Sequence, residues 1–374
     1  MSNAFEYTFP CIRGYQAGRE YYVSMCPLGL LPKIILFDEE EVVPELRAQR
    51  TLSRSRVPQI ADYMLSNPND YVFSAITVSV DGDTRFEGVT DGDKNTGRLC
   101  VPMSSRFIIN DGQHRRAGIE LALRENPDLA RETISVVFYP DKGLERAQQI
   151  FADLNRHAVR PSRSLSLLYE HRDKKVQLTK NLVGRVPLFK GFVENERSDL
   201  SSRSRKLFTL SVLHTATWDL LDGQDREEEA LEQLAADFWN EIHKHIPEWE
   251  WVRTAKLTAG DVRQDFVHAH PVVIRALGRA GNALLKQQPR HWREGLENLD
   301  QIDWLRSNGP TWEGRATIGG RIAQAGLNVV LTTNYIKTVL DLPLSRAERG
   351  FEDAFLKANS GRKEQFAVEP ALSY

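Results

Sequence analysis

The segment 111–115, Asp-Gly-Gln-His-Arg, carries the residues of this sequence best suited to bind an anion. The apolar run at 107–110 before it predicts a buried strand, and the pattern over 113–125 predicts a helix. This order leaves several backbone N–H groups free at the start of the helix, where the helix dipole also favours an anion. Gly112 has no Cβ, so a phosphate can approach the backbone closely. The pattern therefore predicts a phosphate-binding turn.

The side chains of this turn suggest individual roles. Arg115 lies one turn into the helix and can bind two phosphate oxygens with its planar guanidinium. Gln113 and His114 are placed to contact the same phosphate, and His114 can also act as an acid or base near neutral pH. Asp111 can cap the helix or hold a magnesium ion bound to the phosphates. The alternative is a plain strand-to-helix turn, which explains Asp111 and Gly112 but not the Gln-His-Arg-Arg run that follows.

Positive side chains gather in three short stretches of the chain. The formal net charge is only −2, so any contact with DNA has to come from a local patch. Serines alternate with the arginines in the first two stretches, and hydroxyl and guanidinium groups are common phosphate ligands. The ordinary interpretation of one such stretch is a solvated, salt-bridged face. The three stretches are Arg47, Arg50, Arg54 and Arg56; then Arg197, Arg203, Arg205 and Lys206; then Arg156, Arg160, Arg163, Arg172, Lys174 and Lys175.

Composition indicates an ordinary globular protein, with 41% hydrophobic and 27% charged residues. Three widely separated cysteines have neither zinc-site spacing nor a disulfide pattern, which suits a reducing cytoplasm. No basic start followed by an apolar stretch is present, and no apolar run approaches the roughly 18 residues that a membrane span needs. We therefore expect a cytoplasmic protein that has no membrane partner and no structural metal.

The hydrophobic patterns change character along the chain and predict an α+β fold. Short strands are expected at 5–12, 19–25, 33–37, 71–80 and 133–139, with helices at 44–50, 57–65, 113–125 and 144–154. Beyond about residue 163 the strand signals stop, and long helical patterns follow at 206–221, 227–245, 268–286 and 320–340. We predict an α+β domain over 1–175 and a mostly helical domain over 176–374.

The segment 111–115 also resembles known motifs. It spells DGQHR, the motif that names a family of proteins, several of them linked to DNA modification and defence. It is similar to the phosphate-binding turn of the ParB/sulfiredoxin superfamily, since Gly112 and Arg115 match the Gly-x-x-Arg pattern at a helix start. Gln113 stands where sulfiredoxins have their cysteine nucleophile, so sulfinic-acid repair is not expected. The resemblance implies a ParB/sulfiredoxin-like N-terminal domain that binds phosphate or a nucleotide.

Over nearly its whole length the chain resembles the DndB family. The resemblance implies a DNA-binding regulator of the phosphorothioation genes, acting on double-stranded DNA beside the enzymes that put sulfur into the DNA backbone. The segments that carry it are 7–10, 13–14, 18–22, 32–33, 36–37, 47–50, 71–75, 202–208 and 334–337, together with 111–115.

The ParB-like resemblance further implies a segment that helps to close the nucleotide site. Asn155, Arg156 and Arg160 are the candidates for it, and the nucleotide would be ATP or CTP with magnesium. The alternative is that Asn155 ends a helix and the two arginines are solvated.

Three functions remain open from the sequence. The first is a DNA-binding regulator with a nucleotide-responsive site at Gly112. The second is an enzyme, an NTPase or a metal-dependent DNA nickase, in which Asp111 holds magnesium and His114 positions or activates water. The third is a module that docks onto the modification enzymes through the helical half. Each is compatible with a homo-oligomer.

Overall fold

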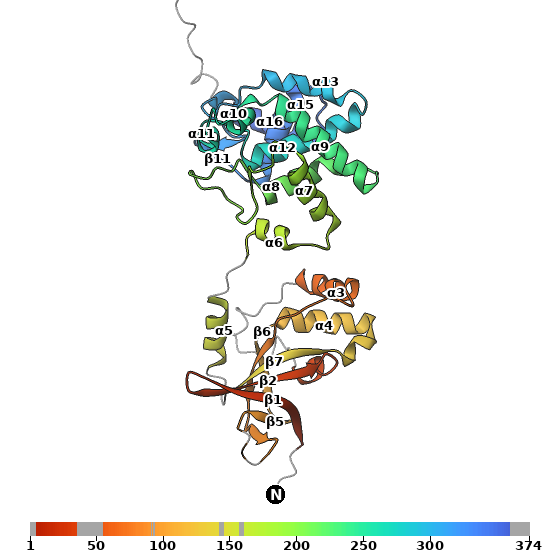
Figure 1. Ribbon diagram of the computed structural model, residues 1–374, viewed down its shortest axis with the longest axis vertical. Coiled ribbons are helices and arrows are strands. Elements are labelled where there is room, and N and C mark those ends of the chain that lie inside the picture. Colours follow the sequence, from red (N-terminus) through yellow and green to blue (C-terminus); the bar gives the residue numbers. More distant parts are fainter. Residues whose placement is uncertain are drawn as a thin grey trace, which may run out of the picture. The chain divides into compact units, whose positions relative to one another are not determined.

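A computed structural model describes residues 5–35, 55–90, 92, 94–141, 146–156 and 161–359. The chain forms two compact units, Met1–Val159 and Arg160–Tyr374 (Figure 1). The division falls earlier than the boundary after residue 175 that the sequence pattern suggested. Helices α6 (Arg163–Tyr169) and α7 (Lys174–Arg185) contact α8 (Leu210–Leu221), and α7 also contacts α9 (Glu228–Lys244), which places the stretch after residue 160 within the helical unit.

The first unit is built on one mixed seven-stranded sheet with the order β4-β5-β1-β2-β7-β3-β6. β3 and β7 run parallel, and the other neighbours pair antiparallel. A tight turn joins β1 to β2, with positive φ at Ala17 (49°) and Gly18 (71°), as two-residue hairpins require. The strands are β1 Glu6–Gln16, β2 Arg19–Pro27, β3 Ile76–Asp81, β4 Arg85–Gly88, β5 Thr96–Pro102, β6 Arg106–Asp111 and β7 Thr133–Pro140.

Two helices, α3 and α4, lie side by side next to the sheet of the first unit (Figure 1). Gly118 of α4 allows their close approach, because a Cβ there would lie 2.4 Å from Cγ2 of Ile60 in α3. Ile119 and Ala122 on α4 are fully buried and belong to the same core as Ile76 of β3. The helices of this unit are α1 Leu31–Ile34, α3 Arg56–Ser66, α4 Gln113–Glu125, η1 Pro127–Arg131 and α5 Ala147–Arg156.

The second unit is mostly helical, with two small two-stranded sheets. Its helices are α6 Arg163–Tyr169, α7 Lys174–Arg185, α8 Leu210–Leu221, α9 Glu228–Lys244, α10 Pro247–Arg253, α11 Ala259–Asp265, α12 Pro271–Gln287, α13 Trp292–Leu296, η3 Glu297–Gln301, α14 Gly309–Trp312, α15 Gly326–Val339 and α16 Arg346–Asn359. Its strands are β8 Val193–Glu194, β9 Phe208–Thr209, β10 Thr317–Ile318 and β11 Arg321–Ile322.

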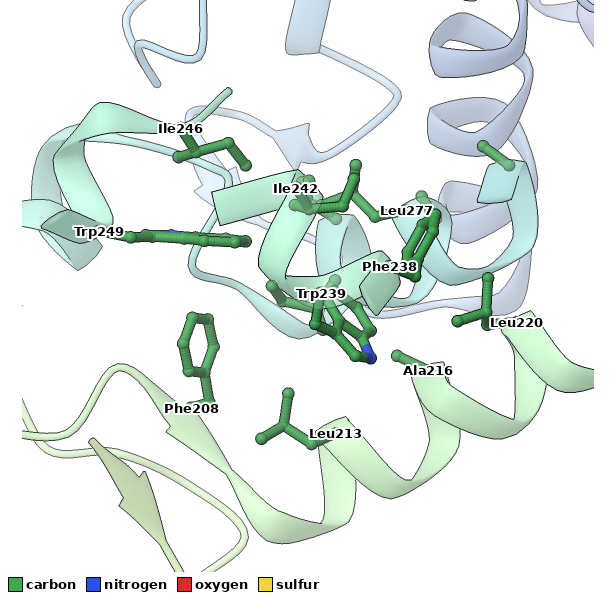
Figure 2. Close-up of a cluster of buried hydrophobic side chains, with 14 of the residues drawn as sticks. Phe208, Leu213, Ala216, Leu220, Phe238, Trp239, Ile242, Ile246, Trp249 and Leu277 are labelled. Carbon is green, nitrogen blue, oxygen red and sulfur yellow. The ribbon is translucent and has the colours of Figure 1, made fainter. Parts of the chain in front are cut away.

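The core of the second unit is rich in aromatic side chains (Figure 2). Leu213, Ala216 and Leu220 lie on one face of α8 and point toward Phe238 and Trp239 of α9. The spacing of three and four residues along α8 is that of an amphipathic helix. The opposite side of α8 is therefore left to polar side chains.

The expected α+β class is confirmed, with the large sheet in the first unit and the helices dominating the second. The prediction of a strand over 33–37 is wrong in its described part, because Leu31–Ile34 forms a short helix with Pro32 in its first turn, where proline is well tolerated. The helices expected over 206–221 and 320–340 start later than predicted, since the short strands β9 and β11 precede α8 and α15. The expected helix over 44–50 lies outside the described residues. Among the residues that are described, no helix is both long and apolar enough to cross a membrane.

Candidate phosphate-binding turn and basic loop

Gly112 forms the turn between β6 and α4 that the sequence predicted. Its φ of 108° is in the left-handed range, which favours glycine because a side chain there is strained. A Cβ would also lie 3.0 Å from Cγ1 of Ile76. Gly112 is the N-cap residue, and no side chain caps the first turn of α4. Asp111 therefore does not act as the helix cap, and the backbone N–H groups of the first turn receive no side-chain acceptor from the N-cap position.

Arg115 is held tightly by its surroundings. Its Nη2 donates to Oδ2 of Asp111 at 2.6 Å, and its Nη1 donates to the carbonyl oxygen of Ser74 at 2.7 Å and to the Ser74 hydroxyl. Its side chain is 14% exposed, against 49% for Asp111. The guanidinium thus ties the end of β6 to the first turn of α4 and to the segment before β3. No local pattern predicted Ser74 as the partner of Arg115, because the two residues are far apart in the chain.

His114 is partly buried next to the start of α3. Burial lowers its pKa below the ordinary value, and the nearby Arg56 lowers it further, while Asp111 opposes the shift. The imidazole is therefore neutral at pH 7. Arg56 is exposed at the beginning of α3, so this one described member of the first basic stretch lies near the Gly112 turn.

Several predicted contact residues cannot be placed. Arg47, Arg50, Arg54 and Arg160 lie outside the described residues. Asn155 and Arg156 end α5, but their side chains are not described. Their predicted roles in DNA or nucleotide binding stay predictions. In the described ranges of the chain, no three side chains of His, Cys, Asp or Glu are grouped so that they could hold a metal ion.

The second basic stretch forms an irregular segment of the helical unit, which we call the Ser/Arg loop, residues 197–206. Arg197, Arg203 and Arg205 are exposed, and none of them forms an ion pair with a residue that the structure describes. Lys206 is different, because its Nζ donates to the carbonyl oxygen of Gly191 at 2.8 Å. The loop therefore presents three unneutralised guanidinium groups together with exposed serines.

A buried arginine that the sequence reasoning missed, Arg263 of α11, holds the Ser/Arg loop in shape. It is 8% exposed, and its guanidinium donates to the carbonyl oxygens of Ser201 at 2.9 Å and Ser204 at 2.9 Å. It also donates to the carbonyl oxygens of Ser202 and Lys206. Burial lowers its pKa, but an arginine remains charged at neutral pH.

Two further observations define the surroundings of Arg263. No described carboxylate pairs with it, so only loop carbonyls compensate its charge. Its own carbonyl oxygen accepts a hydrogen bond from Nε2 of His270 at 2.7 Å. A signal was present in the sequence, because Arg263 follows the buried Ala259 and Val262 at helical spacing and so falls on the apolar face of α11.

A comparison with protein families identifies a match. The model of a family described as DndB, DNA-sulfur modification-associated, matches residues 9–343. No curated protein and no solved structure matches the chain. The matched region includes both the Gly112 turn and the Ser/Arg loop.

Proposed function

Because this chain belongs to the DndB family of DNA-sulfur modification-associated proteins, we propose that it is a DNA-binding regulator of that modification. Its main ligand would be double-stranded DNA, and its partners the enzymes that put sulfur into the DNA backbone. Regulation would follow from coupling two sites, a DNA-binding surface on the helical unit and a phosphate-binding turn at Gly112.

The observation that carries DNA binding is the way Arg263 presents the Ser/Arg loop. Its guanidinium donates hydrogen bonds to four loop carbonyl oxygens, so these partial negative charges face the protein interior and not the solvent. The side chains of Arg197, Arg203 and Arg205 are left at the surface without acidic partners. Exposed guanidinium and hydroxyl groups on an ordered backbone suit DNA phosphates, and such contacts contribute affinity that falls with salt.

The Gly112 turn supports the second part of the proposal. The first turn of α4 offers backbone N–H groups, and Gly112 lets a phosphate approach them. Gln113 and the neutral His114 flank this position, and Arg56 adds a nearby positive charge. The expected ligand is ATP or CTP with magnesium. Asp111 is exposed enough to contact magnesium, but in doing so it would give up its ion pair with Arg115.

Arg115 therefore has two roles in the proposal. Without ligand it holds the turn through Asp111 and Ser74. With nucleotide bound, its release from Asp111 would supply a guanidinium to the phosphates and loosen the segment before β3. That exchange is the step through which a nucleotide would alter DNA binding.

The test is a titration of labelled duplex DNA at two salt concentrations, with and without ATP or CTP plus magnesium. We expect Arg203→Ala/Arg205→Ala to weaken DNA binding about tenfold or more and to reduce the salt slope by up to about 2, the value for two lost phosphate contacts. Lys190→Ala/Arg290→Ala removes two exposed cations elsewhere in the same unit and serves as the matched control. Equal affinities for the two double variants would reject the DNA-binding surface.

A separate measurement addresses the turn. Arg115→Ala should abolish the effect of nucleotide on DNA binding and leave the affinity without nucleotide close to that of the parent. An unchanged nucleotide effect would reject the role of Arg115 and leave the DNA-binding surface standing.

A further inference from the structure

A polar cleft lies in the helical unit, with a volume of about 800 Å³. α6, α7, α8 and α12 contribute to its wall. A separate cavity lies beside the Ser/Arg loop, where Ser198 and Ser202 line it, and the two share no lining residue. The side chains that matter here are Arg163, Lys175, His214 and Trp218. Arg163 and Lys175 belong to the third basic stretch of the sequence, which the proposed function does not use.

The charges around this cleft are unevenly compensated. Asp219 pairs with Arg275 at 3.1 Å and contacts Arg279 at 3.5 Å, and Glu348 pairs with Lys337 at 2.7 Å. Asp222 is the remaining carboxylate of the wall.

The cations Arg163 and Lys175 form no ion pair with any residue in the described part of the chain. Nζ of Lys175 lies over the Trp218 ring, 4.9 Å from its centroid, and Nε1 of Trp218 donates to the Lys175 carbonyl oxygen at 3.1 Å. The indole thus fixes the base of the lysine. Two cations that lack acidic partners are left at the end of the cleft formed by α6 and α7.

His214 and Trp218 are four residues apart and lie on the same side of α8, where both line the cleft. Leu213, Ala216 and Leu220 form the buried face of this helix (Figure 2). Burial lowers the pKa of His214, and Arg163 and Lys175 lower it further, while Asp173 opposes them. The imidazole is therefore neutral at pH 7, beside two cations.

Hydrogen bonds assign the tautomer of His214. The Thr179 hydroxyl donates its only proton to the Lys175 carbonyl oxygen at 3.0 Å. The 3.0 Å contact between the Thr179 oxygen and Nδ1 of His214 must then be donated by Nδ1. In the neutral ring Nε2 then carries no proton and can only accept a hydrogen bond. The His214 side chain lines the cleft.

We propose that this end of the cleft binds a phosphate group, with Arg163 and Lys175 as its cationic ligands and Nε2 of His214 as a third ligand that takes up a proton from solvent. An entering anion offsets the repulsion from the two cations, so the imidazolium becomes stable and can donate to a phosphate oxygen. The phosphate can belong to a nucleic-acid backbone or to a free nucleotide. The inference is independent of the Gly112 turn and of the Ser/Arg loop.

The test uses the full chain carrying Arg203→Ala/Arg205→Ala and Gly112→Ala, so that binding at the Ser/Arg loop is weakened and nucleotide binding at the Gly112 turn is disrupted. Two probes are titrated, a short oligothymidylate without terminal phosphates and ATP without magnesium. Arg163→Gln/Lys175→Gln should weaken the probe that the cleft accepts about tenfold or more, the loss expected for two charge-assisted contacts. Lys190→Gln/Arg290→Gln is the matched control and should bind like the parent. The probe whose binding is weakened by Arg163→Gln/Lys175→Gln shows whether the cleft takes the phosphate of a nucleic-acid backbone or of a free nucleotide.

A proton measurement complements the titration, since diester phosphates do not titrate near neutral pH. Oligothymidylate binding should strengthen as the pH falls from about 8 to about 6, and the imidazole NMR signals of His214 should move to the protonated position on binding. His214→Gln should bind with little pH dependence. The proposal is overturned if neither probe binds at the cleft, or if the Arg163/Lys175 variant binds both probes as tightly as the control.

Discussion

The Gly112 turn and the Ser/Arg loop each depend on an arginine that organises backbone, but the two arginines are neutralised differently. Arg115 has a carboxylate partner, Asp111, and one carbonyl partner, Ser74. Arg263 has only carbonyl partners. The Arg115–Asp111 pair is therefore close to electrically balanced, and the turn attracts an anion mainly through backbone N–H groups and the nearby Arg56. The loop keeps its positive charge, so it should provide most of the affinity for DNA and most of the salt dependence.

The largest effect is expected from Arg263→Met, which removes the organiser of the loop but keeps much of its volume. The loss of charge-assisted hydrogen bonds to four carbonyls should lower the free energy of unfolding by about 2–4 kcal/mol. DNA affinity should fall to that of Arg203→Ala/Arg205→Ala, although Arg263 is buried. Urea unfolding and DNA titration at a temperature where the variant is folded measure both effects.

The control for that variant is Arg253→Met, an exposed arginine paired with Glu250 on α10. It should change stability and DNA affinity little, since exposed ion pairs contribute little. Parent-like DNA binding by folded Arg263→Met would break the comparison, because the loop would then not depend on its buried arginine.

Acid should weaken the helical unit through His270, which donates to the Arg263 carbonyl oxygen. Burial lowers the pKa of His270 to about 4 from its ordinary 6.5, so the unfolded chain binds more protons between these values. The free energy of unfolding should fall as the pH drops below about 6.5 and level off below about 4. His270 alone should account for a loss of roughly 3 kcal/mol over this range. Tryptophan fluorescence during urea unfolding at each pH reports it, because all seven tryptophans lie in this half of the chain.

His270→Gln should flatten that pH profile in part, since burial also lowers the pKa values of His214, His243 and His268. His291→Gln, at an exposed position, should leave the profile as it is. If the free energy of unfolding depends on pH in the same way in both variants, His270 does not contribute to the acid destabilisation.

Gly112→Ala tests whether the turn depends on its left-handed backbone. A side chain at φ 108° and 3.0 Å from Ile76 should cost about 1–3 kcal/mol of stability and abolish the nucleotide effect on DNA binding. Gly184→Ala is the matched control, because Gly184 lies in α7 with no neighbouring atom within 4 Å of the new Cβ. It should be neutral or stabilising by up to about 1 kcal/mol. A Gly112 variant that responds to nucleotide like the parent would contradict the phosphate-binding turn.

The smallest effect, and the one that most sharpens the comparison, is expected from Asp111→Asn. Removal of the carboxylate charge leaves Arg115 without its ionic partner, so the affinity for nucleotide without magnesium should rise about three- to tenfold. Asp81→Asn removes a carboxylate of the same sheet that pairs with Arg106 at 2.9 Å, and should have no such effect. A loss of magnesium-dependent binding in Asp111→Asn would identify Asp111 as a magnesium ligand. A lower nucleotide affinity without magnesium would contradict the view that Asp111 neutralises Arg115 and so weakens anion binding.

The sequence alone determined the features that depend on local order: a buried strand over 107–110, a turn at Gly112, a helix from Gln113, and the change from mainly strands to mainly helices along the chain. Hydrophobic periodicity and glycine conformation act over a few residues, so these features can be predicted from neighbours in the chain. Only the tertiary structure decided which partners those residues meet. Ser74 reaches Arg115, Arg56 lies near His114, and Arg263 collects the carbonyls of a loop that precedes it by some sixty residues. Such contacts depend on how the elements pack, and no spacing within the chain encodes them.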